Sequence, residues 1–393
     1  MATTAAQTTE TTKGKAHWQL ACSACATPAS HDRASVCGAC GQPLFASYGN
    51  VAASTPLADR WDSWRYAPFM PLIAGESPVS LGEGLTPLID SPALARHAGV
   101  RRLWIKDESQ NPTGSFKARG MSAAVTRARG DGVQGLVVPT AGNAGAALAA
   151  YGAAAGLPVR VFAPRTTPRP ILDTIEAMGA TLVRIDGHIG DAGKLAIAYA
   201  AESGYFNVST LREPYRVEGM KTMGFELAEQ LGWRLPDVIV YPTGGGEGTI
   251  GIWKAIEELM SGGWLPPSSR QPRYLVAQAA GCAPIARAFA KGHDRAEPWA
   301  DPVTHASGLR VPSPLGDRLL LRVMRETGGL AGIASEEAIR EATRVLSTAT
   351  GIDAAPEGGC ALSVLRDAVA EGAISPDAEV VLFNTGAGAS YRG

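Results

Sequence analysis

The stretch Gly135-Leu-Val-Val-Pro-Thr-Ala-Gly-Asn-Ala-Gly145 opens an alternation of strand-like and helix-like segments, and this alternation decides the fold class. The pattern predicts strand, helix, strand, helix and strand, in that order, over 136–138, 144–155, 159–162, 170–178 and 181–185. Short apolar strands separated by helices are typical of a parallel sheet that helices cover on its faces. The stretch therefore predicts an α/β fold with open, parallel-rich sheets.

A second set of helix and strand patterns occupies the rest of the chain. It predicts a helix over 222–232 and strands over 103–106, 238–240, 274–277 and 378–383. We expect residues 51–118 and 211–393 to pack together as a large domain, and residues 119–210 to form a small, mobile α/β domain. Ligands of open α/β sheets bind beyond the carboxyl ends of the strands, so the cleft between the two domains is the expected ligand site.

Lys117 follows a glycine turn in the stretch Ser109-Gln-Asn-Pro-Thr-Gly-Ser-Phe-Lys-Ala-Arg-Gly120 and stands at the expected start of a helix. Backbone N–H groups and the positive end of a helix lower the cost of a neutral amine there and attract a nearby anion. An anionic aldehyde such as pyridoxal phosphate needs such an amine for its Schiff base. A lysine after a turn can equally be a solvated surface residue, so a second signal is needed.

The second signal is the glycine-rich stretch Tyr241-Pro-Thr-Gly-Gly-Gly-Glu-Gly-Thr-Ile-Gly251, which links an expected strand to an expected helix. Glycines let the backbone approach a phosphate closely, and the N-terminus of the following helix adds partial positive charge. The alternatives are close packing of the strand and helix, or a dinucleotide site, although the usual acidic residue for a ribose is absent. Combined with Ser115-Phe-Lys117 and with Thr140-Ala-Gly-Asn-Ala-Gly145, the stretch favours a pyridoxal-phosphate site.

Four cysteines near the N-terminus have the spacing of a metal site. Cys22 and Cys25 form one knuckle, and Cys37 and Cys40 form a second one eleven residues later. Four thiolates in this pattern can surround zinc tetrahedrally, so a structural zinc in a ribbon-like segment over 17–50 is the first interpretation. A ribbon that has lost its metal, or a pair of disulfides, is the alternative.

The composition limits the classes of partner. A formal net charge of −1 over 393 residues gives no reason to expect nucleic acid. No apolar run reaches the ~18 residues that cross a bilayer and no secretory signal is present, so we expect no membrane partner and a cytoplasmic location. Residues 1–16 lack apolar periodicity and are expected to form a disordered tail.

Taken in chain order, four motifs resemble those of the fold-type II pyridoxal-phosphate enzymes, the tryptophan synthase β superfamily. They are Lys106-Asp-Glu-Ser-Gln-Asn-Pro-Thr-Gly-Ser-Phe-Lys117, Ala141-Gly-Asn-Ala-Gly145, the loop 244–248 and Asn384-Thr-Gly386. Within that superfamily the chain is most similar to the threonine synthase family, from about residue 81 to the end. The resemblance implies a two-lobed fold whose large domain binds pyridoxal phosphate, a small zinc-ribbon-like appendage, and a homodimer.

The resemblance also implies roles for single residues. Lys117 matches the Schiff-base lysine, which also serves as general base, and Phe116 matches the position that flanks the cofactor ring. Asn143 matches the asparagine at the phenolic oxygen, and Thr385 matches the hydroxyl that faces the pyridine nitrogen and favours chemistry at Cβ and Cγ. The family's phosphate loop corresponds to Gly244, Gly245, Gly246, Gly248 and Thr249.

The implied substrate is O-phospho-L-homoserine, which with water gives L-threonine and phosphate by β,γ-elimination and replacement. Its phosphate needs a second anion pocket, for which Arg212, Arg216 and Lys221 are the candidates. The chain departs from the family here: Thr210-Leu-Arg-Glu-Pro214 stands where Asn-Ser-x-Asn-Pro is usual, and the loop after residue 138 lacks two hydroxyl residues. In the alternative interpretation, both arginines pair with neighbouring glutamates on the surface.

Other functions stay open at this point. Another fold-type II enzyme would carry out β-replacement on an activated serine, as cysteate and cysteine synthases do, or would deaminate serine or threonine. A zinc-ribbon binding protein with an inactive enzyme body would dock through residues 22–40, but this segment has few basic residues. Glu357 either faces the active cleft or lies in a surface turn.

Overall fold

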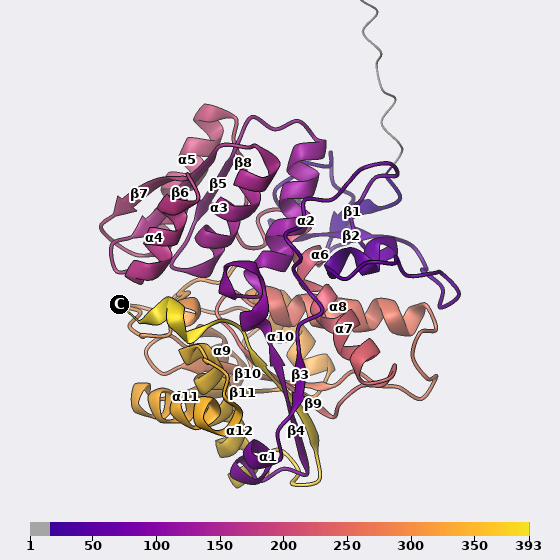
Figure 1. Ribbon diagram of the computed structural model, residues 1–393, viewed down its shortest axis with the longest axis vertical. Helices are drawn as coiled ribbons and strands as arrows, with labels where there is room; N and C mark the ends of the chain where they lie inside the picture. The colour runs from indigo at the N-terminus through magenta and orange to yellow at the C-terminus, as the bar shows by residue number, and fades with distance from the viewer. Residues whose placement is uncertain (1–15, 393) are drawn as a thin grey trace, which may run out of the picture.

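The computed structural model describes residues 16–392 and contains three separate sheets (Figure 1). The expected disordered tail therefore lies outside the described residues, except for Ala16, which packs against a buried apolar cluster. No helix in the described part of the chain is both long and apolar enough to cross a bilayer.

The small lobe is built on a four-stranded parallel sheet with the strand order β7-β6-β5-β8. Its strands are β5 (Leu136–Pro139), β6 (Val159–Pro164), β7 (Thr181–Ile185) and β8 (Phe206–Asn207). Its helices are α2 (Lys117–Gly130), α3 (Asn143–Ala155), α4 (Arg169–Ala177) and α5 (Ile189–Ser203). Helices α3 and α4 pack on the sheet together with α2, and α5 contributes to a separate apolar cluster with β5 and β6.

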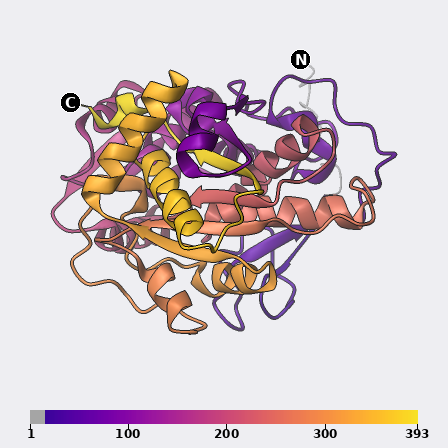
Figure 2. The same cartoon turned by 90° about the horizontal axis from the view of Figure 1, so that it is seen from below.

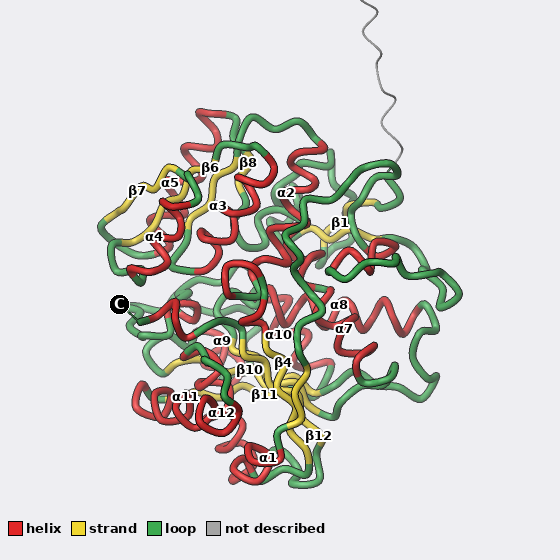
Figure 3. The backbone as a smooth tube through the Cα atoms, in the orientation of Figure 1, coloured by secondary structure: helices red, strands yellow, loops and turns green. Residues whose placement is uncertain are grey.

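The large lobe is built on a six-stranded sheet with the order β11-β10-β9-β12-β4-β3, parallel except for the pair β3 and β4. Its strands are β3 (Leu88–Asp90), β4 (Arg102–Asp107), β9 (Val238–Pro242), β10 (Arg273–Ala279), β11 (Leu330–Ala334) and β12 (Glu379–Asn384). The last strand of the chain therefore lies between two strands from much earlier in the sequence. Figure 3 shows the two groups of strands well apart, with loops between them.

Helices cover both faces of the large sheet. One group contains α1 (Pro92–Ala98), α11 (Glu336–Thr350) and α12 (Pro356–Ala370). The other contains α6 (Tyr215–Met220), α7 (Thr222–Gln230), α8 (Glu247–Ser261), α9 (Pro284–Ala290) and α10 (Asp317–Glu326). In Figure 2 the two helices α11 and α12, drawn in yellow tones, lie together on one side of the strands. The two buried apolar clusters on either face make this lobe a three-layered α/β structure.

The third sheet is a two-stranded antiparallel ribbon of β1 (Gln19–Cys22) and β2 (Leu44–Ser47), beside α6 in Figure 1. The prediction of an α/β fold with parallel-rich sheets and a small N-terminal appendage is thus confirmed. All strands of the small sheet come from 119–210, but α2 begins at Lys117, so the expected domain boundary after residue 118 falls inside a helix.

Candidate active site

A cavity of about 500 Å³ lies between the two lobes, at the carboxyl ends of strands from both sheets. The small lobe contributes the loop after β5, over 139–144, and Ser209 and Thr210 beyond β8. The large lobe contributes the loop after β9, over 242–248, and Thr385 directly after β12. Ligands of open α/β sheets bind at this edge, so the topology places the candidate site here.

Lys117, the first residue of α2, lines this cavity, and its side chain is 20% exposed. Burial lowers the pKa of Lys117 to about 8, and the charge of Arg216 lowers it further, while Glu247 and Glu357 oppose this shift. The amine lies 4.1 Å from the ring centroid of Phe116, which also lines the cavity. A lysine with this pKa is partly neutral near pH 7 and can act as a nucleophile.

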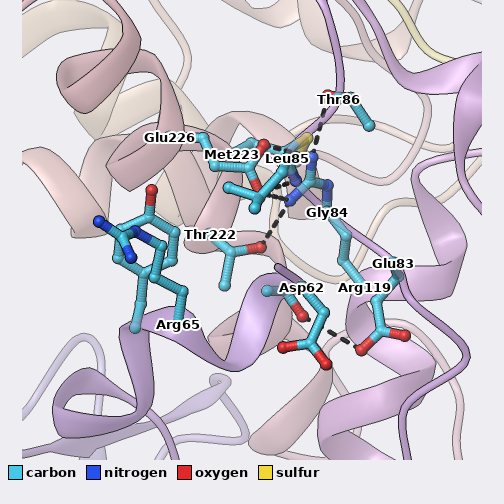
Figure 4. A network of polar contacts seen from close by, with 12 residues as sticks. Asp62, Arg65, Glu83, Gly84, Leu85, Thr86, Arg119, Thr222, Met223 and Glu226 are labelled. Atoms are coloured by element: carbon cyan, nitrogen blue, oxygen red, sulfur yellow. Dashed lines mark hydrogen bonds and ion pairs between the residues drawn. The ribbon is translucent and has the colours of Figure 1, made fainter. Parts of the chain in front are cut away.

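Arg119 fixes the position of Lys117 from inside the protein. Its guanidinium has no solvent exposure and pairs with Glu108 and Glu226 at 2.6 and 2.5 Å. It also donates hydrogen bonds to Thr86 and Thr222. Figure 4 shows Arg119 reaching between Thr86, Thr222 and Glu226. These contacts tie the first turn of α2 to the large lobe, so the amine of Lys117 is presented from a rigid element.

The glycine-rich loop has the shape expected of a phosphate cradle, although it is shorter than predicted. Helix α8 begins at Glu247, directly after Gly246, whose φ of 84° suits glycine. A Cβ atom on Gly244 would lie 2.3 Å from the carbonyl oxygen of Gly308, so a side chain has no room there. The loop therefore brings bare main chain and a helix N-terminus to the cavity, which suits a phosphate.

Two members of the predicted phosphate loop lie inside α8. Thr249 is fully buried, its hydroxyl lies 3.4 Å from that of Thr243, and its side chain is not among those that line the cavity. Gly248 lines the cavity, but a Cβ atom there would lie 2.1 Å from the hydroxyl of Tyr241. Packing against Tyr241 is thus enough to require glycine at this position.

Asn143, at the start of α3, and Thr385 both line the cavity. The amide nitrogen of Asn143 lies 3.5 Å from the hydroxyl of Tyr391, which donates to Glu357 at 2.8 Å. Glu357 lines the cavity and is 4% exposed, so the interpretation as a surface turn is wrong. Its Oε1 also accepts the N–H of Gly308 at 2.8 Å, while its Oε2 has no hydrogen-bond partner within the described chain. Burial raises the pKa of Glu357.

Comparison with known proteins places this cavity in a family. A family model described as "Pyridoxal-phosphate dependent enzyme" matches residues 79–386. The chain belongs to this family. The threonine synthase of Methanosarcina acetivorans is 35% identical over 326 residues, which cover 82% of this chain and 78% of that protein. The threonine synthase of Methanocaldococcus jannaschii is 33% identical over 327 residues, which cover 83% of this chain and 80% of that protein.

Solved structures support the same family fold. Maize serine racemase is similar with a TM-score of 0.67 and 22% identity, covering 77% of this chain and 88% of its own. The serine racemase of Dictyostelium discoideum has a TM-score of 0.62 and 21% identity, covering 77% of this chain and 92% of its own. The predicted membership of the fold-type II pyridoxal-phosphate enzymes, close to the threonine synthases, is confirmed.

The residues present fit the family's cofactor. A partly neutral lysine lines the same cavity as a side-chain-free loop at a helix N-terminus. The one anionic side chain in that loop, Glu247, is ion-paired with Arg216 at 2.7 Å, which offsets its repulsion of a phosphate.

The predicted substrate residues are not all brought together. Arg212 lines the cavity, but Arg216 does not; it is fully buried and donates to Glu247 and to the carbonyl oxygen of Val208. Lys221 lies elsewhere, fully buried between Glu218 and Glu258. Neither Arg216 nor Lys221 lines the cavity. The burial of Arg216 also contradicts the interpretation in which it forms an ion pair on the surface.

The sulfur atoms of Cys22, Cys25, Cys37 and Cys40 all lie within 4.8 Å of one another. Cys22 and Cys40 are 3.4 Å apart, and Cys25 is 3.7 Å from Cys37. Tetrahedral zinc with Zn–S bonds of about 2.3 Å would separate its sulfurs by about 3.8 Å, close to these values. The four thiols can therefore hold a zinc ion with no open coordination position.

Several cavity residues were not predicted from the sequence. Glu247 stands inside the glycine-rich motif, but a motif does not tell which way its side chain turns. Tyr391, Ser307 and Lys194 line the cavity from loops or helices with no recognisable signal of their own.

Proposed function

We propose that the protein is a pyridoxal-phosphate-dependent lyase that converts O-phospho-L-homoserine and water into L-threonine and phosphate. The observation that carries the proposal is the partly neutral Lys117 in one cavity with the glycine-rich N-terminus of α8. Threonine synthases that are 33% and 35% identical over most of this chain support the choice of reaction.

Several groups in the cavity have a task in this proposal. Pyridoxal phosphate, when bound, supplies an aldehyde that bonds to amines and a ring that takes up electrons from the neighbouring carbon. Lys117 would bond to that aldehyde, and the main chain over 244–247 would hold the phosphate at the start of α8. Asn143 and Thr385 line the same cavity, and by the resemblance Asn143 would donate its amide N–H to the phenolic oxygen while the hydroxyl of Thr385 would serve the ring nitrogen. A hydroxyl in that role would leave the nitrogen neutral, which would restrain charge build-up at Cα.

Lys117 is also the base in this proposal. Once the substrate has displaced it, the free amine removes the proton from Cα, a task that a pKa of about 8 suits near neutral pH. A proton would then leave Cβ as phosphate leaves Cγ, after which Cγ and Cα would each regain a proton. Water would add its hydroxyl at Cβ and give its remaining proton to the released phosphate, so that one water is consumed for one phosphate released. Arg212 is the candidate for the substrate's phosphate, because it lines the cavity and an arginine can bind phosphate through two parallel N–H groups.

A second candidate is β-replacement on an activated serine or deamination of serine or threonine. Within the described chain, the basic residues that line the cavity are Lys117, Lys194 and Arg212, and Lys194 is 81% exposed and paired with Asp191. The carboxylate of Glu357 lines the same cavity. A phosphorylated substrate would thus meet fewer cations than the sequence predicted, and within this second candidate that favours deamination of serine or threonine, which carry no phosphate.

Product analysis separates these candidates. The holoenzyme is given O-phosphohomoserine alone, O-phosphoserine with sulfite, or L-threonine alone, and both phosphate and the amino-acid products are measured. Threonine and phosphate in equal amounts from the first substrate support the proposal. Cysteate from the second or 2-oxobutanoate from the third, without threonine from the first, would favour the alternative.

The role of Lys117 is tested separately. Lys117→Ala should remove both turnover and the visible absorbance of the bound cofactor, whereas Lys291→Ala, an exposed residue after α9, should keep both. Borohydride reduction followed by peptide mapping should place the cofactor on the peptide that contains Lys117. Label on another lysine contradicts the proposal.

A further inference from the structure

Glu247 places a buried carboxylate next to Lys117, and the proposed reaction gives it no task. It is the first residue of α8, its side chain is 1% exposed, and it lines the cavity. Its Oε2 lies 3.6 Å from the amine of Lys117 and 2.7 Å from a guanidinium nitrogen of Arg216. Its Oε1 has no hydrogen-bond partner among residues 16–392.

Arg216 holds this carboxylate in place. It is fully buried, and its second terminal nitrogen donates to the carbonyl oxygen of Val208 at 2.8 Å. The guanidinium and the Glu247 carboxylate form a buried ion pair at 2.7 Å, which limits how far the carboxylate can move. The Glu247 side chain thus lies between the guanidinium of Arg216 and the amine of Lys117, and the amine can lose its charge near neutral pH.

The distance to Lys117 is longer than a normal hydrogen bond. At 3.6 Å the interaction is an attraction between charges, with no fixed donor geometry to break when the amine moves. Two further charged groups act on Lys117 from other elements, namely Arg216 on α6 and Glu357 at the start of α12. Glu247 is the carboxylate within ion-pair distance, so its charge acts on the amine most directly.

We propose that Glu247 is a positioning residue for Lys117, which holds the free amine beside the glycine-rich loop whenever that amine is not bonded to the cofactor. The inference rests on the proposed function, in which Lys117 must leave the cofactor, carry a proton and return. A protonated amine that drifted into the cavity would be slow to return. Attraction to Glu247 keeps it near, and the same charge favours the protonated form that Lys117 takes after it has removed the proton from Cα.

A merely structural role predicts a different result. If Glu247 served only to pair with Arg216, its replacement would change stability but leave the proton affinity of Lys117 unaltered. The proton affinity of Lys117 in the protein without cofactor is therefore the decisive quantity, and it can be measured without any substrate.

The test is competitive acetylation of the cofactor-free protein from about pH 6 to about pH 10, with the Lys117 peptide quantified by mass spectrometry against Lys291. Glu247→Gln should move the midpoint of Lys117 labelling down by about one pH unit, which makes the amine up to about tenfold more reactive below the midpoint. Glu247→Asp keeps the charge with a shorter reach and should give a smaller downward shift. Glu257→Gln, an exposed carboxylate on the same helix, should give none.

The outcomes separate this inference from the proposed function. An unchanged Lys117 midpoint in either Glu247 variant that folds, as judged by circular dichroism, overturns the positioning role. The Glu247→Asp variant, compared with wild type, gives the answer if Glu247→Gln does not fold. Borohydride mapping of the holoenzyme is a separate measurement: if it places the cofactor on a lysine other than Lys117, the proposed function fails while the labelling result still stands.

Discussion

The guanidinium of Arg119 and the carboxylate of Glu226 form an ion pair in which neither side chain has any exposure to solvent. Arg119 follows Lys117 by two residues in α2, and Glu226 lies in α7 of the large lobe. The pair therefore joins the helix that carries the candidate catalytic lysine to the lobe that carries the glycine-rich loop. Lys106 completes the cluster through a 2.9 Å contact with Glu226.

Glu226→Gln should destabilise the protein strongly. Burial alone would raise the pKa of Glu226, but Arg119 and Lys106 lower it to about 2, so the carboxylate is charged at every physiological pH. Its neutralisation leaves two buried cations without their shared partner, at a cost of about 3–5 kcal/mol in the free energy of unfolding. Urea denaturation measures this cost. Glu341→Gln, which breaks an exposed pair with Arg344, should leave the midpoint unchanged, and a similar loss in both variants would contradict the argument.

The rate of cofactor loading should rise with pH. The neutral amine is the nucleophile, and the pKa of Lys117 is lowered from 10.5 to about 8, mainly by burial. The neutral fraction therefore increases as pH rises through about 8, and the loading rate should reach half its maximum there. Stopped-flow absorbance after mixing cofactor-free protein with pyridoxal phosphate gives the profile. A midpoint near 10.5, the value of an ordinary lysine, would show that burial does not act on this amine.

Arg212→Gln should weaken the binding of a phosphorylated substrate more than it slows the chemistry. Arg212 lines the cavity, and loss of a charge-assisted contact to phosphate costs roughly 1.5–3 kcal/mol, or about ten- to a hundredfold in KM. Steady-state kinetics with O-phosphohomoserine should show this rise with a smaller change in kcat. Arg33→Gln, an exposed residue outside this cavity, serves as the control. Equal KM values for the wild type and the Arg212 variant would remove Arg212 from the substrate site.

Cys37→Ser should abolish stoichiometric zinc binding. The sulfur of Cys37 belongs to a group of four that lie within 4.8 Å of one another, and a structural site needs all four ligands. The loop between the two cysteine pairs contacts the body through Ser35 with Arg212 and Asp32 with Tyr215, so loss of metal should also make this loop sensitive to proteolysis. Metal analysis by mass spectrometry and limited digestion measure both effects. Cys282→Ala, which removes a buried thiol elsewhere, should retain the metal.

Local sequence patterns predicted the regular part of the fold well. The strand expected over 181–185 coincides with β7, and the helix expected over 144–155 differs from α3 by one residue. Strand β8 has two residues, and β11 combines alanine and glycine with apolar residues, so neither has the apolar run that marks a strand. Their pairing depends on neighbouring strands, which a local pattern does not contain.

The cofactor side of the site was predictable because it depends on the backbone. A glycine loop, a strand end and a helix N-terminus can be recognised from the local sequence. Lys117, Asn143 and Thr385, which were predicted in this way, all line the cavity. The substrate side of the site depends on the direction in which long side chains point. Arg216 and Lys221 carry the right charge, but two glutamates on α8 hold both of them outside the cavity, the buried Glu247 and the partly exposed Glu258. No spacing rule reveals such a partner.

The place of β12 in the large sheet has a consequence for how the protein is made. This strand pairs with β4 on one side and β9 on the other, so the centre of the sheet is missing until residues 379–384 have left the ribosome. The small sheet, whose strands all lie between residues 136 and 207, can assemble long before that moment. Lys117 can thus lie on a folded lobe before Thr385 has been synthesised, and the cavity that both residues line is complete only after β12 has joined the large sheet.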